Sequence, residues 1–358
     1  MHKARINFTP GPSQLYFTVE DHMKYAFREG IPSLSHRSKQ FDKIFKDTTE
    51  GIRALLGVPP NYHIFFTGSA TEIWERSIQN LVEFSSFHLV NGSFSKRYFE
   101  VARQLNKQST SIEVKEGKGF DSINVPSNTE LIAITHNETS TGVSLPISFI
   151  ESIRNENPDA LIAVDAVSSL PYPKLPYDKL DSVFFSVQKG FGLPAGLGVW
   201  MVNDRCIEKA ERMIAKGISI GSYHNIPTLL QNEKKHQTPE TPNVLSIFLL
   251  GKVVGDMLAK GIEKIRKETE YKAAILYQTL DKHASLEPFV LQPEFQSKTV
   301  IVANTGNATE EITSLLMENG MHPGDGYGSN KKTQLRFANF PTHGKEQFEL
   351  LCDTLEKF

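Results

Sequence analysis

The sequence predicts an α/β fold, with a large domain built on a seven-stranded, mostly parallel sheet flanked by helices and a smaller C-terminal α/β domain. Short apolar runs alternate with longer amphipathic segments from residue 63 to residue 202, which is the pattern of consecutive βα units. After a long helical stretch from about residue 244 to residue 283, a second and shorter alternation begins. We therefore expect residues 15–258 to form the large domain and residues 259–358, together with 1–14, to form the small one.

The expected strands of the large sheet are short apolar runs bounded by polar or turn-forming residues. They lie at 63–67, 87–91, 109–114, 131–135, 161–165, 182–188 and 198–202. Apolar residues at three- and four-residue spacing predict helices at 39–56, 70–84, 95–106 and 147–156. In the small domain, the expected strands are "KTVIVAN" and "QLRFANF", and the expected helices are "ATEEITSLLMENG" and "GKEQFELLCDTLEKF".

The composition excludes several classes of protein. A formal net charge of -2 leaves no basic surface for nucleic acid or an anionic membrane. The most apolar stretch, "VLSIFLLGKVVGDMLAKG", is interrupted by Lys252 and Asp256 and does not predict a membrane span. Two distant cysteines, Cys206 and Cys352, provide neither a disulfide framework nor a metal site. We expect a cytoplasmic protein that acts on small molecules, without a metal.

A glycine-rich loop follows the expected strand at 182–188, in the stretch "VQKGFGLPAGLGVW". Such a loop after a strand is also found in dinucleotide-binding motifs, but those motifs need a helix directly after the glycines to meet the pyrophosphate. Here the next segment, 198–202, is predicted to be a second strand. The context therefore excludes a dinucleotide loop, and Lys189 needs another explanation.

Asp165 and Lys189 lie where two apolar strands of the predicted sheet end. Ligands of open α/β sheets bind at the carboxyl ends of strands, so these two side chains are candidates for one site. Alone, either residue is usually a surface group, a helix cap or a turn residue. Together with Gln188 and the glycine loop, they are the pair that pyridoxal phosphate chemistry requires. The lysine amine forms a Schiff base with the cofactor aldehyde, and the carboxylate keeps the pyridine nitrogen protonated.

Several segments resemble those of class V, fold-type I pyridoxal phosphate-dependent aminotransferases, in the same order and over nearly the whole chain. They are "AVDAVSS", "SVQKGFGLPAGLGV" and "HNETSTGV". "INFTPGPSQL" and "SHRSKQF" are most similar to the phosphoserine aminotransferases of that class. "NGSFSKRYFEVA" lies between these and the alanine–glyoxylate or serine–pyruvate group. The resemblance implies the fold-type I architecture and amino transfer between an amino acid and a 2-oxo acid.

The resemblance also implies a role for each residue around the cofactor ring. Lys189 carries the cofactor, Asp165 pairs with the ring nitrogen, and Thr139 lies near the phenolic oxygen. Phe94 stands where tryptophan is usual in phosphoserine aminotransferases, and it stacks on the ring. From the sequence alone, Thr139 is equally compatible with ordering a turn.

The cofactor phosphate is implied to have three sets of contacts. The first contact is the side chain of Gln188. The second is with the backbone amides of Ala70 and Thr71, because the N-terminus of a helix that starts there favours negative charge. The third comes from "HQTPETPN", which resembles a segment that crosses a dimer interface. Thr238 is thereby expected to bind the cofactor phosphate of the neighbouring subunit in a homodimer.

For the substrate, Arg336 in "QLRFANFP" matches the arginine that binds the α-carboxylate, a planar two-point contact suited to guanidinium. His36 and Arg37 match the part of the family motif on the side of the substrate phosphate. They are also compatible with the polar start of the next helix. The family's His-Arg pair before the carboxylate arginine is missing, and "GYGSNKKTQLR" replaces it with two lysines.

The implied activity is the conversion of 3-phosphohydroxypyruvate and glutamate to phosphoserine and 2-oxoglutarate in serine biosynthesis. One alternative is an alanine–glyoxylate, serine–glyoxylate or serine–pyruvate aminotransferase on the same scaffold. A non-catalytic protein that retains the fold is a second alternative, against which the intact pair Lys189 and Asp165 argues.

Overall fold

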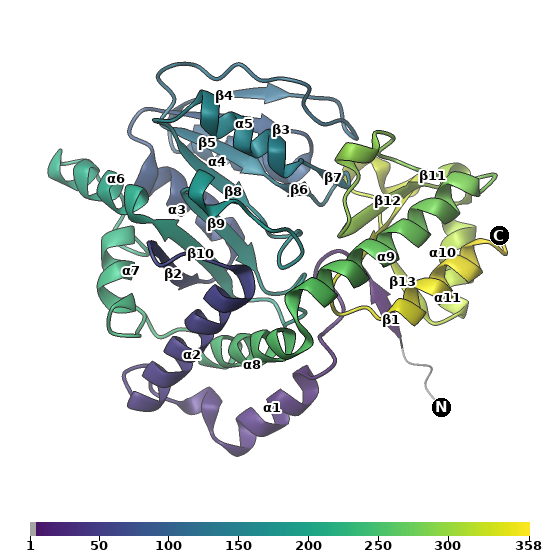
Figure 1. The fold of residues 1–358 in the computed structure, drawn as a ribbon, viewed down its shortest axis with the longest axis horizontal. Helices are drawn as coiled ribbons and strands as arrows, with labels where there is room; N and C mark the ends of the chain where they lie inside the picture. Colours follow the sequence, from purple (N-terminus) through teal and green to yellow (C-terminus); the bar gives the residue numbers. More distant parts are fainter. Residues whose placement is uncertain (1–4) are drawn as a thin grey trace.

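The computed structural model describes residues 5–358, which form two α/β units, each around its own sheet (Figure 1). The large sheet has seven strands in the order β2-β10-β9-β8-β5-β3-β4. Its strands are β2 (Tyr62–Thr67), β3 (Ser85–Val90), β4 (Gln108–Glu113), β5 (Leu131–Thr135), β8 (Leu161–Asp165), β9 (Ser182–Ser186) and β10 (Gly198–Asn203). Every strand predicted for this sheet is present. All pairs are parallel except those of β10, which runs antiparallel to β2 and β9.

Helices cover both faces of the large sheet, because its central strands are apolar at consecutive positions and buried throughout. Side chains alternate along each strand: Phe184 packs into one core, and its neighbours Val183 and Phe185 pack into the other. On the first face lie α3 (Ala70–Leu81), α4 (Ser93–Gln104), α6 (Asp204–Ala215) and α7 (Ile226–Glu233). On the second lie α2 (Lys39–Leu56), α5 (Ile147–Glu156) and α8 (Val244–Lys260).

The small unit contains a five-stranded sheet in the order β1-β13-β14-β12-β11. The strands are β1 (Ile6–Phe8), β11 (Glu287–Pro288), β12 (Val300–Asn304), β13 (Met321–Asp325) and β14 (Gln334–Ala338). The chain reaches this unit through α9 (Ile262–Lys282), which packs with α10 (Thr309–Glu318) and α11 (Lys345–Leu355) in one apolar core. Strand β1 pairs in parallel with β13, so an N-terminal segment completes a C-terminal sheet.

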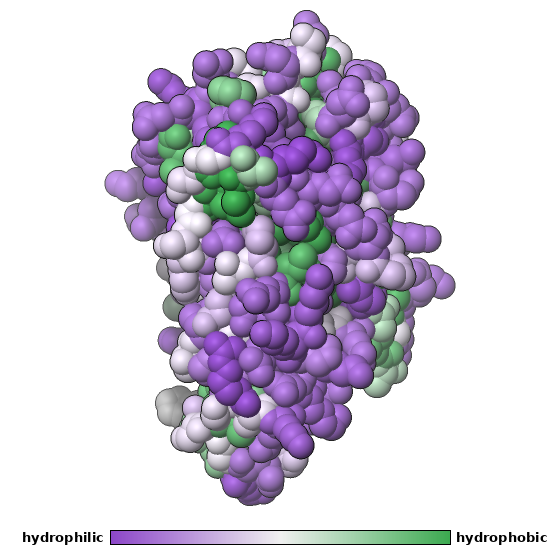
Figure 2. Space-filling view, turned by 90° about the vertical axis from the view of Figure 1, so that its left-hand side faces the viewer, coloured by the Kyte–Doolittle hydropathy of each residue, from purple (hydrophilic) through white to green (hydrophobic). Residues whose placement is uncertain are grey.

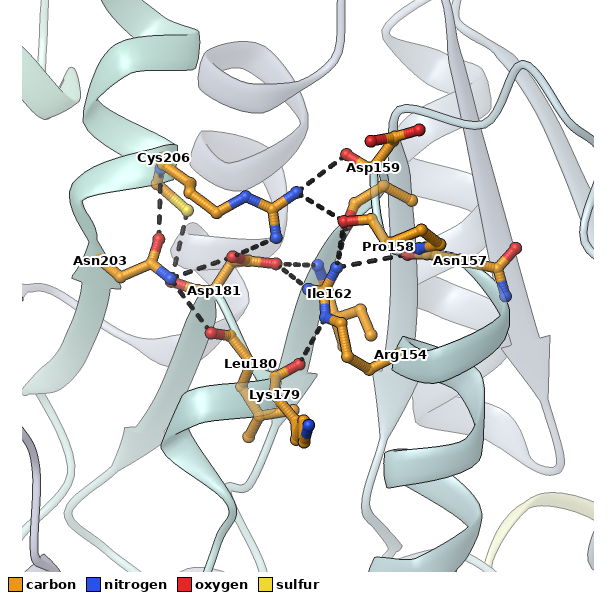
Figure 3. Close-up of polar contacts among 12 residues, drawn as sticks. Arg154, Asn157, Pro158, Asp159, Ile162, Lys179, Leu180, Asp181, Asn203 and Cys206 are labelled. Atoms are coloured by element: carbon orange, nitrogen blue, oxygen red, sulfur yellow. Dashed lines mark hydrogen bonds and ion pairs between the residues drawn. The ribbon is translucent and has the colours of Figure 1, made fainter.

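A buried charge cluster holds the large sheet at the edge where β8 and β9 begin (Figure 3). Asp181 is almost fully buried and contacts Arg154 of α5 and Arg205 of α6. Its carboxylate also accepts hydrogen bonds from the backbone N–H of Ile162 (2.8 Å) and from Asn203 Nδ2 (3.0 Å). A buried carboxylate needs this many donors to replace water. The cluster therefore fixes α5, α6, β8 and β9 to one another, at the edge opposite to Asp165.

The face of the molecule shown in Figure 2 is mostly hydrophilic, and its hydrophobic areas are small and separate. The N-terminal part of the chain carries four large apolar side chains that are exposed: Leu15, Phe17, Tyr25 and Phe27. The last two belong to α1 (Val19–Arg28). Among residues 5–358, no helix is both long enough and apolar enough to cross a membrane.

Candidate active site

A cavity of about 210 Å³ opens at the carboxyl ends of β5, β8 and β9, beside the start of α3. The large unit supplies most of its wall, and the small unit adds side chains from β14 and from the loop after β13. Residues 10–12, between β1 and α1, also line it. Of the predicted site residues, the cavity brings together Ala70, Thr71, Phe94, Thr139, Asp165, Gln188, Lys189 and Arg336.

Lys189 lies in a turn just after β9, which ends at Ser186 and is shorter than the strand predicted at 182–188. The side chain is buried, and Nζ donates a hydrogen bond to Thr139 Oγ1 at 2.8 Å. Nζ also lies 5.3 Å from the centre of the Phe94 ring. Burial lowers the pKa of Lys189 to about 8, because a buried ammonium loses hydration. The amine is therefore available in its neutral, nucleophilic form at mildly alkaline pH.

The glycines around Lys189 are required by close packing rather than by a bound nucleotide. A Cβ atom at Gly190 would lie 2.0 Å from the backbone oxygen of Leu170. On the other side, a Cβ at Gly11 would lie 2.9 Å from Lys189 Cε. Gly190 therefore lets the chain after Lys189 pass close to Leu170, and Gly11 lets the N-terminal loop approach the lysine side chain.

Asp165 ends β8, and both of its oxygens accept hydrogen bonds. Trp74 Nε1 donates to Oδ2 at 2.8 Å, and the backbone N–H of Val167 donates to Oδ1 at 3.0 Å. Burial raises the pKa of Asp165 to about 6, although these two hydrogen bonds favour the ionised form. A cation next to the carboxylate would stabilise the ionised form of Asp165 further. A protonated pyridine nitrogen is such a cation.

Trp74 was not among the predicted site residues. It lies on the buried face of α3 at a position where an aromatic residue ordinarily signals a packed core, and its indole N–H faces the site. Its hydrogen bond to Asp165 identifies it as an orienting partner of that carboxylate.

The end of the cavity at α3 has donors suited to a phosphate. Ala70 and Thr71 form the first turn of α3, and Gln188 faces the same space. The Ala70 N–H is already engaged, since it donates to Ser186 Oγ at 2.8 Å. Ser186, which sequence analysis missed, also lines the cavity. Thr135 Oγ1 is buried in the cavity wall without a protein partner among the described residues. The donor set, the unpaired hydroxyl, the buried acid and the lysine fit pyridoxal phosphate.

Arg336, on β14, extends into the cavity from the small unit. Its Nε donates to the backbone oxygen of Asp325 at 2.7 Å, and Nη1 donates to that of Thr139 at 3.1 Å. The guanidinium lies 5.3 Å from the centre of the Tyr327 ring, and Tyr327 also contacts Phe94 across a ring distance of 5.2 Å. Tyr327 therefore links the two units at the cavity mouth. Sequence analysis missed it because a tyrosine in a glycine-rich loop carries no specific signal.

Three predicted residues, His36, Arg37 and Thr238, do not line the cavity within the described chain. His36 and Arg37 precede Ser38, the N-cap of α2. Arg37 donates hydrogen bonds to Gln237 Oε1 (2.8 Å) and to the backbone oxygen of Thr238 (2.9 Å). The structure thus brings the segments "SHRSKQF" and "HQTPETPN" together, away from the cavity that their own chain forms. The role of Thr238 toward a neighbouring subunit stays a prediction.

Comparison with known proteins agrees with this geometry. The family model of class-V aminotransferases matches residues 99–329. A crystal structure of a phosphoserine aminotransferase from Cytophaga hutchinsonii is 53% identical, has a TM-score of 0.97, and is matched over 99% of this chain and 98% of that one. The phosphoserine aminotransferase of Rhodococcus opacus is 27% identical over 96% of this chain and 91% of its own length. A pyridoxal phosphate-bound phosphoserine aminotransferase from Trichomonas vaginalis shares the fold, with a TM-score of 0.79. It is 18% identical, and the match covers 98% of this chain and 99% of that one.

A cavity at the carboxyl edge of a mostly parallel sheet, with a buried lysine and an acid in its wall, defines a cofactor-dependent transferase. The chain belongs to the class-V aminotransferase family. It is a transaminase whose cofactor is pyridoxal 5'-phosphate.

Proposed function

We propose that this enzyme transfers the amino group of glutamate to 3-phosphohydroxypyruvate, giving phosphoserine and 2-oxoglutarate, a step of serine biosynthesis. The observation that carries the proposal is the cavity in which Lys189, Asp165 and Arg336 lie together. The 53% identity to a phosphoserine aminotransferase over nearly the whole chain supports the choice of substrate.

Each of these side chains has a defined task. Pyridoxal phosphate supplies an aldehyde for the amino group and a ring that accepts electrons from the substrate α-carbon. Arg336 binds the substrate α-carboxylate through its planar guanidinium. The neutral amine of Lys189 removes the proton from the α-carbon, and Asp165 keeps the ring nitrogen protonated. Two half-reactions share this site, so the kinetics are expected to be ping-pong.

The substrate phosphate is assigned to Arg37 of a second subunit. Arg37 lies exposed next to the segment 237–240, which the sequence predicts to cross a dimer interface. A phosphate leaving water needs charge-assisted donors, and a guanidinium is the strongest of these among side chains. The proposal therefore includes a cytoplasmic homodimer, in which Arg37 and Thr238 of one chain serve the cavity of the other.

One observation favours the alternative, an alanine or serine aminotransferase that uses glyoxylate or pyruvate. In the stretch "GYGSNKKTQLR", which replaces the family's His-Arg pair, Tyr327 is the residue before Arg336 that lines the cavity. An aromatic ring there provides no charge for a phosphate, so the phosphate must be bound by other groups if phosphoserine is the substrate.

A panel of amino donors and 2-oxo acceptors, assayed with the purified protein after addition of pyridoxal phosphate, distinguishes the two. We expect the highest kcat/KM with phosphoserine as donor and 2-oxoglutarate as acceptor. A preference for alanine over phosphoserine would move the enzyme to the alternative group. A protein that stays colourless with added cofactor would instead support a non-catalytic role.

A further inference from the structure

We infer that His224 is a positioning residue for cofactor binding, which in its protonated form ties the start of α3 to the segment 237–240. The part of this inference that concerns the second subunit rests on the proposed function, because only there does the segment 237–240 meet a cofactor. The part that concerns α3 depends on one chain alone.

His224 lies between two carboxylates that come from these two elements. Its side chain is 1% exposed. Nδ1 is 2.6 Å from Oε1 of Glu72, on α3, and Nε2 is 2.9 Å from Oε2 of Glu240. The contact with Glu240 lacks the alignment of a hydrogen bond and is an ion pair. Among the ion pairs of residues 5–358, only those of His224 join these two acids.

Two carboxylates on the two ring nitrogens favour the imidazolium form. A neutral imidazole has one N–H, so it would present a lone pair to one of the acids. Burial lowers the pKa of His224, but Glu240 and Glu72 together raise it to about 9. Other charged groups nearby are Arg76, whose Nε lies 4.0 Å from Glu72 Oε1, and His36, which interacts with Glu240. The ring of Tyr223 stacks on the imidazole, with 3.9 Å between the ring centres.

The backbone conformation of His224 is unusual for a residue with a side chain. Its φ of 50° lies in the left-handed region, which is uncommon for residues other than glycine. The position directly precedes Asn225, the N-cap of α7. Helix α7 packs into the core of the large unit. The backbone of His224 is therefore fixed relative to that core.

On the side of α3, Glu72 shapes the loop that is expected to bind the cofactor phosphate. Its other carboxylate oxygen accepts a hydrogen bond from the Gly68 N–H at 2.9 Å. Its own N–H donates to the N-cap hydroxyl of Ser69 at 3.1 Å. Ala70 and Thr71 lie between these contacts and line the cavity. A displaced Glu72 would therefore shift the amides that face the phosphate.

On the other side, Glu240 is joined to Thr238, since the Thr238 hydroxyl donates to the Glu240 backbone oxygen at 2.8 Å. Arg37 donates hydrogen bonds to the Thr238 and Pro239 backbone oxygens of the same segment. Both His224 and Arg37 thus contact the segment. One imidazolium thereby orders phosphate-binding groups of two cavities.

The test compares two ligands that differ only in the phosphate. Cofactor-free wild-type protein and His224→Gln are titrated with pyridoxal phosphate and with phosphate-free pyridoxal, and binding is followed by visible absorbance. Because a lost charge-assisted contact leaves the phosphate amides misplaced, we expect His224→Gln to bind pyridoxal phosphate roughly tenfold more weakly. Binding of pyridoxal should be unchanged, because Lys189 and Asp165 are intact.

A matched control is His63, which also lies between two carboxylates, Asp204 at 3.6 Å and Glu233 at 3.4 Å, but contacts neither α3 nor the segment 237–240. His63→Gln should bind both ligands like the wild type. If His224→Gln does not fold, Glu72→Gln makes the comparison for the α3 side and Glu240→Gln for the side of the segment 237–240, each with the imidazole in place.

Equal weakening for both ligands, or no weakening for pyridoxal phosphate, would overturn the inference. The proposed substrate is judged separately, from the donor preference of the wild-type enzyme.

Discussion

At the scale of single residues, the protonation of Lys189 controls how the cofactor is attached. Only the neutral amine attacks an aldehyde, and burial lowers the pKa of Lys189 to about 8. The amine is charged below this value and neutral above it. We therefore expect the rate of pyridoxal phosphate attachment to cofactor-free protein to rise with pH and to level off above about 8. Stopped-flow absorbance measures this rate.

The control for this measurement is Lys189→Ala, which should develop no visible band from a lysine-bound cofactor and should not transaminate. Turnover by Lys189→Ala at the wild-type rate would show that another residue is the attachment site. A wild-type attachment rate that is independent of pH across this range would contradict the assigned protonation.

The ion-pair cluster around Asp181, at the end of the sheet opposite to the cavity, is expected to stabilise the fold. Replacing Asp181 with alanine leaves Arg154 and Arg205 without their shared carboxylate, and Arg154 is itself buried. Breaking a buried ion pair from one side costs about 3–5 kcal/mol, so Asp181→Ala should lower the free energy of unfolding by about that much. Denaturant unfolding measures the loss. KM values should not change, since the cluster lies far from the cavity edge of the sheet.

Asp178 is the matched control for Asp181, because it is a nearby acid that pairs with Lys179 at 3.8 Å and is 76% exposed. Asp178→Ala should change stability by no more than about 0.5 kcal/mol. Similar losses in both variants would mean that burial of the cluster contributes little.

At the scale of elements, the polar segment before α2 is predicted to act on the substrate of the other chain. Arg37→Ala should reduce kcat/KM for phosphoserine by roughly ten- to a hundredfold, the effect of one lost charge-assisted contact of about 1.5–3 kcal/mol. Turnover of alanine should fall much less, because alanine has no phosphate. Steady-state kinetics with the two donors measures the difference, and equal losses would remove Arg37 from phosphate binding.

Elements whose sequence pattern matches their burial were predictable. Strands β5 and β8 coincide with the predicted 131–135 and 161–165, since short runs of consecutive apolar residues are typical of parallel strands covered on both faces. Strand β13 was missed because "MHPGD" contains both proline and glycine, and its pairing with β1 and β14 decides its conformation.

The site could be predicted only where family motifs or strand ends identified it. Lys189 and Asp165 follow or end apolar runs, so their position at the carboxyl ends of strands could be predicted from the sequence. In the sequence, Trp74 looks like an ordinary core residue. Only the structure shows that its N–H donates a hydrogen bond to Asp165. His224 and its two acids lie far apart in sequence, at 72, 224 and 240, and no spacing rule joins them.

At the scale of the whole molecule, we expect the active unit to be a homodimer. Exposed apolar side chains gather on the N-terminal part of the chain, with Phe17 74% and Phe27 62% exposed, and such groupings mark surfaces that another chain covers. Sedimentation velocity should give the mass of two chains at micromolar concentration. Full activity of a monomer at catalytic dilution would contradict the shared-site arrangement.

The pairing of β1 with β13 has a consequence for the order in which the enzyme is made. Ile6 lies beside Met321, so strand β1 leaves the ribosome long before its partner β13 has been made. Arg336 and Tyr327 arrive in the same late stretch. A nascent chain can thus complete the sheet around Lys189 early, while the loop at residues 10–12 and the carboxylate-binding arginine join it last. Catalytic competence is therefore acquired late in synthesis, when β1 and β13 pair.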